Sequence, residues 1–218
     1  MKYLFERTED QGKTFVYSVD TNDETKANLC RMTMMNGIKT WRIKYVTYDI
    51  NESLFTEEHI SMRCGLSPIK QNELKEILES RRNSPDYDPK KPDEIFKFYF
   101  DIDSKDREGW VTTDHIKGIP FFMTHKISYV QKNSRLRGYV EVREGYGIEW
   151  SSHMCTTIPT IHKVDDYFEI KFGTLGMYDH EFIMKESIRL MKDEFNASYN
   201  NIYDKPIFSK ACIEEFSN

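Results

Sequence analysis

The segment from about Asp179 to about Tyr199 constrains the fold most, because large apolar side chains recur in it at helical spacing. Six such residues form an apolar arc about 160° wide on one side of a helix; they are Ile183, Met184, Ile188, Leu190, Met191 and Phe195. Burying each of these side chains is worth roughly 1.5–3 kcal/mol, so the arc must be covered. The pattern therefore predicts a long amphipathic helix that packs on the chain's own core, on another molecule, or on both.

A second helix, apolar on two sides, is predicted near the start of the chain in TNDETKANLCRMTMMNG (21–37). Asp23 is a suitable N-cap, and Gly37 stands just past the expected end. The apolar residues form a stripe and a group opposite to it: Ala27, Cys30 and Met34 in the stripe, with Leu29 and Met32 opposite. A helix that is apolar on two sides must be covered twice. We therefore expect an intermolecular helix layer in which both terminal helices contact a partner.

The rest of the chain predicts a mixed α+β fold that is rich in strands. Two further helices are expected, one that begins at the cap Thr56 and ends at Gly65, and one over QNELKEILESRR (71–82). Short aromatic and β-branched runs predict strands; they cover residues 14–19, 41–50, 95–103, 109–116, 121–130, 136–144 and 166–174.

Composition and charge exclude several classes of protein. Asp and Glu outnumber Lys and Arg by 36 to 31, a net charge of −5, which argues against binding nucleic acid mainly through its phosphates. No apolar run is long enough to span a bilayer, and the N-terminal sequence becomes charged too early for a signal peptide. The four cysteines lack metal-type spacing and suit a reducing compartment. We therefore expect an intracellular protein without membrane contact, in the nucleus or the cytoplasm.

One acidic cluster leaves an enzymatic alternative open. Asp101, Asp103 and Asp106 lie close together in DIDSKDREGW, and paired carboxylates can hold a divalent metal. The spacing departs from a calcium loop, because Asp106 comes one position late and Thr112 stands where the loop needs glutamate. A solvated hairpin end is the preferred interpretation. The alternative is a stand-alone α+β metal-dependent hydrolase or transferase that uses Asp101 and Asp103.

A cysteine nucleophile is the other catalytic hypothesis. Cys155 lies near His153 and His162 in the sequence, as a thiol and its base would. No helix start or oxyanion loop accompanies them, and GYG (145–147) lacks the third glycine of a dinucleotide site. We therefore assign no catalytic residue, no metal ligand and no cofactor to this chain.

The order of segments resembles the alpha-type assembly subunits of cellular RNA polymerases. That family comprises the bacterial alpha amino-terminal domain, its archaeal counterpart and the third-largest subunit of eukaryotic polymerase II. Its ANALRR helix core corresponds to ANLCRM (27–32), and its N-x-S-x-L-x-D-E and aHRxGLiPi motifs correspond to NESLFTEEHISMRCGLSPIK (51–70). GWVTTDHI (109–116) is similar to the family's VtasDi, and GYGIEWSSH (145–153) stands where GxGxeHaKW is usual.

The likeness continues to the strand, glycine turn and long helix that close the family fold, here residues 167–195. Several family residues are replaced. Met32 stands for the second arginine of the RR pair, and Met62 stands for the histidine before Arg63. The metal-binding cysteines and the DNA-binding tail domain of some relatives have no counterpart. Such a reduced and divergent member would suit a viral polymerase, in which case the protein is also expected in the virion.

The resemblance implies a discontinuous dimerisation domain, residues 1–41 and 165–218, in which two helices lie on a sheet. A mainly β domain, residues 42–164, is inserted between its halves. The helices would pair with a smaller alpha-like subunit through the apolar residues of both terminal helices; these are Ala27, Leu29, Cys30, Met34, Ile183, Met184, Ile188, Leu190, Met191 and Phe195.

The resemblance also implies that FTEEHISMRCGLSPI (55–69) docks on the second-largest polymerase subunit. Gly65 would release the chain from its helix, and Arg63 would face the neighbouring subunit. Leu66 and Ile69 would hold the segment to its domain. The alternative for Arg63 is a local bond to the carbonyls of its own helix end. Arg31 and Pro68 complete the docking residues. Small assembly subunits are further expected partners, and DNA would be contacted only indirectly.

Overall fold

The computed structural model describes residues 1–105, 108–147 and 155–203, with side chains described as far as residue 193. The predicted mixed α+β class is confirmed, since four α-helices and three antiparallel sheets occur in these residues. The helices are α1 (Glu24–Asn36), α2 (Glu57–Leu66), α3 (Gln71–Arg82) and α4 (His180–Tyr203).

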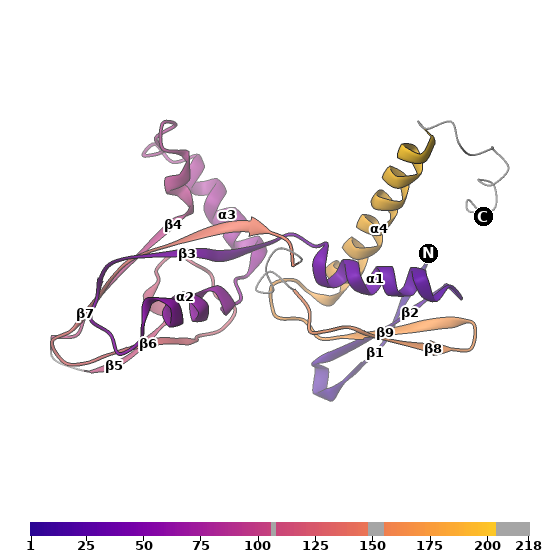
Figure 1. The fold of residues 1–218 in the computed structure, drawn as a ribbon, viewed down its shortest axis with the longest axis horizontal. Helices are drawn as coiled ribbons and strands as arrows, with labels where there is room; N and C mark the ends of the chain where they lie inside the picture. Colours follow the sequence, from indigo (N-terminus) through magenta and orange to yellow (C-terminus); the bar gives the residue numbers. More distant parts are fainter. Residues whose placement is uncertain (106–107, 148–154, 204–218) are drawn as a thin grey trace.

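One sheet combines strands from both ends of the sequence. Its four strands run in the order β1-β2-β9-β8; they are β1 (Tyr3–Glu9), β2 (Thr14–Val19), β9 (Tyr167–Phe172) and β8 (Thr160–Val164). The central contact is the antiparallel β2–β9 pair, in which Tyr17 is opposite Ile170. Helices α1 and α4 pack against each other, and Figure 1 shows both on the same side of this sheet.

The side of the sheet that faces the helices forms one hydrophobic core. Alternation along β2 and β9 places Tyr17, Val19, Ile170 and Phe172 on this side. The helices add the remaining buried residues; they include Cys30, Met34, Ile183, Met184, Ile188 and Met191. This core therefore joins the two ends of the chain.

The residues between the two terminal segments form a second hydrophobic core. It is built on a three-stranded sheet of order β3-β7-β4; its strands are β3 (Thr40–Asn51), β7 (Arg135–Gly145) and β4 (Lys97–Asp103). A hairpin of β5 (Gly109–Thr112) and β6 (Lys126–Val130) and the helices α2 and α3 complete it. Short 3-10 turns lie at Asp10–Gly12, Pro92–Phe96 and Thr113–His115.

Several helix ends lie where capping residues predict them. The Asp23 carboxylate accepts hydrogen bonds from the main-chain nitrogens of Thr25 and Lys26, and α1 ends before Gly37. Thr56 is the N-cap position of α2, as predicted, but its side chain makes no capping bond. The helix ends at Leu66, one residue beyond Gly65, where the sequence predicted its end.

Candidate functional site

The two terminal helices form the layer in which the sequence placed the partner contacts. Asp179 starts α4, since its Oδ1 accepts a hydrogen bond from the main-chain nitrogen of Phe182 at 2.7 Å. The side chains of α4 that face the sheet and α1 are buried. Beyond them, Figure 1 shows the yellow end of α4 rising away from the sheet.

Most of the residues expected to contact a partner lie instead in the chain's own core. Seven of the ten are buried in the single chain, so they have no free surface to offer; they are Ala27, Cys30, Met34, Ile183, Met184, Ile188 and Met191. This corrects the expected contact face, because the chain's own sheet and its two helices already cover these side chains. The side chain of Phe195 lies outside the described residues.

The accessible part of the layer is the outer side of α1. Leu29 and Met32 are 36 % and 38 % exposed, and Leu190 of α4 is half-buried. Arg31 is held within its own helix, since it donates to Asn28 Oδ1 at 2.9 Å and contacts the sulfur atoms of Met32 and Met35. The second apolar side of α1, inferred from the sequence, is therefore exposed in this chain.

The segment from Phe55 to Ile69 lies on the second core. Arg63 donates to the main-chain oxygen of Lys126 at 3.1 Å, rather than to the carbonyls of its own helix end. The carbonyl of Arg63 is bonded instead by the Ser67 hydroxyl at 2.8 Å.

Only one of the two expected anchors of this segment, Ile69, is buried. Leu66 does not hold it to the domain, since its side chain is 55 % exposed, whereas Pro68 and Ile69 are buried. Gly65 lies inside α2, where a Cβ would be 3.4 Å from the main-chain oxygen of Ile43 on β3. A small side chain at this position would therefore contact the strand without overlapping it.

The carboxylates of the enzymatic alternative are already engaged. Asp101 accepts two hydrogen bonds from the Arg135 guanidinium, at 2.8 and 2.6 Å, and this contact lowers the pKa of the Asp101 carboxyl. Asp103 lies 3.4 Å from the Lys105 amine, and Asp106 lies outside the described residues. In the ranges 1–105, 108–147 and 155–203, no group of three His, Cys, Asp or Glu side chains is arranged to hold a metal.

The cysteine hypothesis is contradicted by burial. Cys155 is fully buried, and its Sγ lies 3.6 Å from the main-chain oxygen of Met34. Burial raises the pKa of this thiol to about 12, so it does not form the thiolate that nucleophilic attack requires. His162 is exposed on β8, and His153 lies outside the described residues.

The structure buries one arginine, Arg42, whose burial the sequence analysis did not predict. Arg42 of β3 is 2 % exposed, and burial lowers its pKa to about 10. Its Nε and Nη1 atoms have no hydrogen-bond partner among the residues that the structure describes. The strand pattern could not predict this burial, because an arginine in a strand of alternating character is usually a surface residue.

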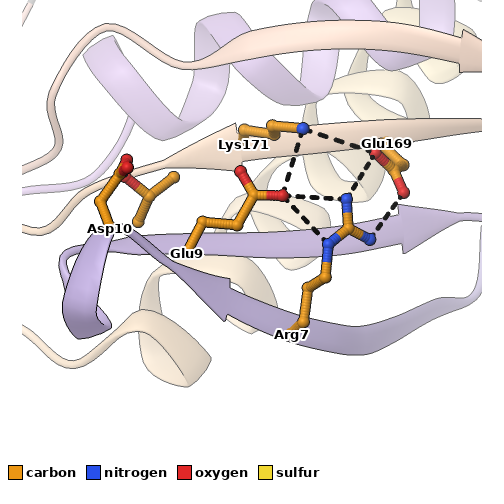
Figure 2. A network of polar contacts seen from close by, with 6 residues as sticks. Arg7, Glu9, Asp10, Glu169 and Lys171 are labelled. Carbon is orange, nitrogen blue, oxygen red and sulfur yellow. Dashed lines mark hydrogen bonds and ion pairs between the residues drawn. The ribbon is translucent and has the colours of Figure 1, made fainter.

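A network of ion pairs covers the face of the four-stranded sheet that is opposite to the helices (Figure 2). Arg7 bonds Glu9 and Glu169, each at 3.0 Å, and Lys171 lies 3.4 Å from Glu9. Beneath these side chains Val16 is fully buried. The long charged side chains thus shield Val16 from water.

Comparison with known proteins gives no assignment. No protein-family model matches the sequence, and a search of the curated proteins finds no relative. In the described part of the chain, no helix combines the length and the apolar character needed to cross a membrane.

Proposed function

We propose that this chain is a non-catalytic assembly subunit of a multisubunit DNA-dependent RNA polymerase. The observation that carries the proposal is the sheet in which β1 and β2 from one end of the chain pair with β9 and β8 from the other. Two helices, again one from each end, pack side by side on this sheet. The alpha-type resemblance of the sequence implies this arrangement, with a separate β-rich unit between the two halves.

The proposed partner at the helix layer is a smaller alpha-like subunit. It would cover Leu29 and Met32 on the outer side of α1, together with the half-exposed Leu190. Large apolar side chains grouped on one helix surface favour such a contact. The unit between the two halves would dock the second-largest subunit, and small assembly subunits would complete the complex. DNA would be contacted only indirectly, and the protein would act in the nucleus, the cytoplasm or a virion.

Co-expression tests the pairing. The chain is produced with the smaller alpha-like subunit encoded by the same genome, and the purified complex is measured by size-exclusion chromatography. Leu29→Glu with Met32→Glu places two charges on the outer side of α1, where the fold tolerates them, and is expected to abolish the heterodimer. Asn72→Glu with Ser80→Glu, two exposed positions on α3, adds the same charge away from this surface; it is the control and is expected to leave pairing intact. A heterodimer that survives the double change contradicts the proposed interface.

A further inference from the structure

A closed ring of contacts joins two cations and two aromatic side chains on the surface of the unit that contains α2. The Arg63 guanidinium lies 4.9 Å from the centre of the Phe55 ring, and the Lys126 amine lies 4.7 Å from that of Trp110. The two rings are 6.1 Å apart. The bond from Arg63 to the main-chain oxygen of Lys126 closes the ring.

Exposed apolar residues of α2 continue this surface. Met62 precedes Arg63, and Leu66 follows it by one helical turn. Each of these two side chains is 55 % exposed, and Trp110 is 42 % exposed. We call the surface formed by the following six residues the cation–aromatic patch: Phe55, Met62, Arg63, Leu66, Trp110 and Lys126.

The charge of the patch is not balanced within the chain. Among the residues that the structure describes, neither Arg63 nor Lys126 forms an ion pair with a carboxylate. The acids of α2, Glu57 and Glu58, lie in its first turn, and neither forms an ion pair with Arg63. Arg135 of the same unit, by contrast, is paired with Asp101. In a chain of net charge −5, these two cations, held beside two aromatic rings, therefore form a local positive site.

We propose that the cation–aromatic patch docks a protein segment that carries carboxylates beside large apolar side chains. Carboxylates would pair with Arg63 and Lys126, whose contacts with the aromatic rings already displace part of their water. Apolar anchors would cover Met62 and Leu66, and methionine adapts its shape to such a contact. Arginine and tryptophan are the residues that most often dominate protein interfaces. The assignment of this segment to the second-largest polymerase subunit rests on the proposed function.

Two designed peptides test the chemistry without any knowledge of the natural partner. Both are amphipathic helices with leucine on one face, and the other face carries glutamate in one peptide and lysine in the other. Fluorescence anisotropy of the labelled peptides is measured with the full chain at low ionic strength. The Leu/Glu peptide is expected to bind at least tenfold more tightly than the Leu/Lys peptide. Equal affinities would overturn the proposal.

Variants locate the binding. Arg63→Glu with Lys126→Glu is expected to weaken the Leu/Glu peptide at least tenfold. Arg63→Met with Lys126→Met keeps the apolar stems and is expected to give an intermediate loss. The control, Lys163→Glu with Lys192→Glu, changes the net charge equally at exposed sites on other elements and should bind as the unchanged chain does. Circular dichroism confirms that each variant is folded. Equal weakening by the control would show a non-specific charge effect and overturn the proposal.

A separate arm tests the identity of the partner. The chain and its Arg63→Glu/Lys126→Glu variant are each co-expressed with the second-largest polymerase subunit. Loss of co-purification in the variant alone supports both proposals. If the unchanged chain binds the Leu/Glu peptide but recovers no polymerase subunit, the patch stands and the proposed function fails. If both versions recover the subunit equally, the function stands and the patch is the wrong surface.

Discussion

The hydroxyl of Tyr17 lies 2.7 Å from Nδ1 of His180, and this hydrogen bond joins the second strand of the chain to the first residue of its last helix. The imidazole also stacks on Phe15, with ring centres 3.9 Å apart. Burial raises the pKa of Tyr17 to about 12, so its hydroxyl remains protonated at neutral pH. One polar contact thus fixes the start of α4 on a sheet whose strands come from both ends of the sequence.

Tyr17→Phe is expected to lower the free energy of unfolding by about 1 kcal/mol, because it removes one hydrogen bond and leaves the packing in place. Urea denaturation followed by circular dichroism measures the change. Tyr45→Phe is the matched control, since that side chain is 53 % exposed, and it should have no effect. Equal stability of Tyr17→Phe and the unchanged chain would show that the contact does not hold α4 in place.

The ion-pair network of Figure 2 predicts a dependence of stability on pH. Hydrogen bonds from Arg7, aided by the charge of Lys171, hold the pKa of Glu169 below its usual range. The stabilisation is therefore complete above the pKa of an unfolded glutamate, about 4.3, and is lost as the pH falls through the lower folded-state value. Urea midpoints measured from pH 7 down to pH 3 should fall in that window.

Glu169→Gln removes the titrating group and is expected to lower the free energy of unfolding by about 1 kcal/mol at pH 7. It should also reduce the loss of stability between pH 7 and pH 3. Glu76→Gln, at an exposed position on α3, serves as the control and should retain the full acid dependence. If the unchanged chain and Glu169→Gln lose stability equally as the pH falls, this network is not the cause of the acid dependence.

Gly138 is expected to tolerate no side chain. It lies in the middle of β7, between Tyr48 of β3 and Phe100 of β4, and a Cβ there would overlap the main-chain oxygen of Thr47. Gly138→Ala should therefore cost about 3 kcal/mol or more, or prevent folding. Gly109→Ala is the control, because a Cβ at Gly109 meets no atom within 4 Å. Thermal melting of the two variants compares them, and equal melting temperatures would contradict the close strand approach.

The buried cysteines are expected to resist alkylation. Burial raises the pKa of the Cys30, Cys64 and Cys155 thiols to about 12, so at pH 8 almost none is present as thiolate. Iodoacetamide should leave all three unmodified in the native protein and label all three in urea, as read by peptide mass spectrometry. Rapid labelling of Cys155 in the native state would reopen the nucleophile hypothesis.

Strong periodicity and capping residues made most elements predictable. The apolar arc of α4, the Asp23 cap of α1 and the aromatic alternation of β4 and β7 are local signals, and each led to the correct element. Strands β1 and β8 were missed. Their sequences, YLFERTE and TIHKV, carry mostly exposed side chains at the two edges of the sheet, so they lack the apolar alternation of a buried strand.

The surface available to partners was the least predictable feature. Apolar spacing shows that Met34 and Ile188 must be covered, but it does not say whether the cover is the same chain or another one. Here the chain's own sheet and helices cover them, and Leu29 is left outside. The cation–aromatic patch could not be predicted from the sequence either. Trp110 and Lys126 are far from Arg63 in the sequence, and only the fold brings them and Phe55 together with it.

The most direct test of the central claim is affinity purification of the tagged chain from the cells in which it is naturally expressed, followed by mass spectrometry of the co-purifying proteins. The account predicts a smaller alpha-like chain and both large polymerase subunits in stoichiometric amounts. Recovery of the protein as a monomer, with no polymerase subunit bound, would contradict it.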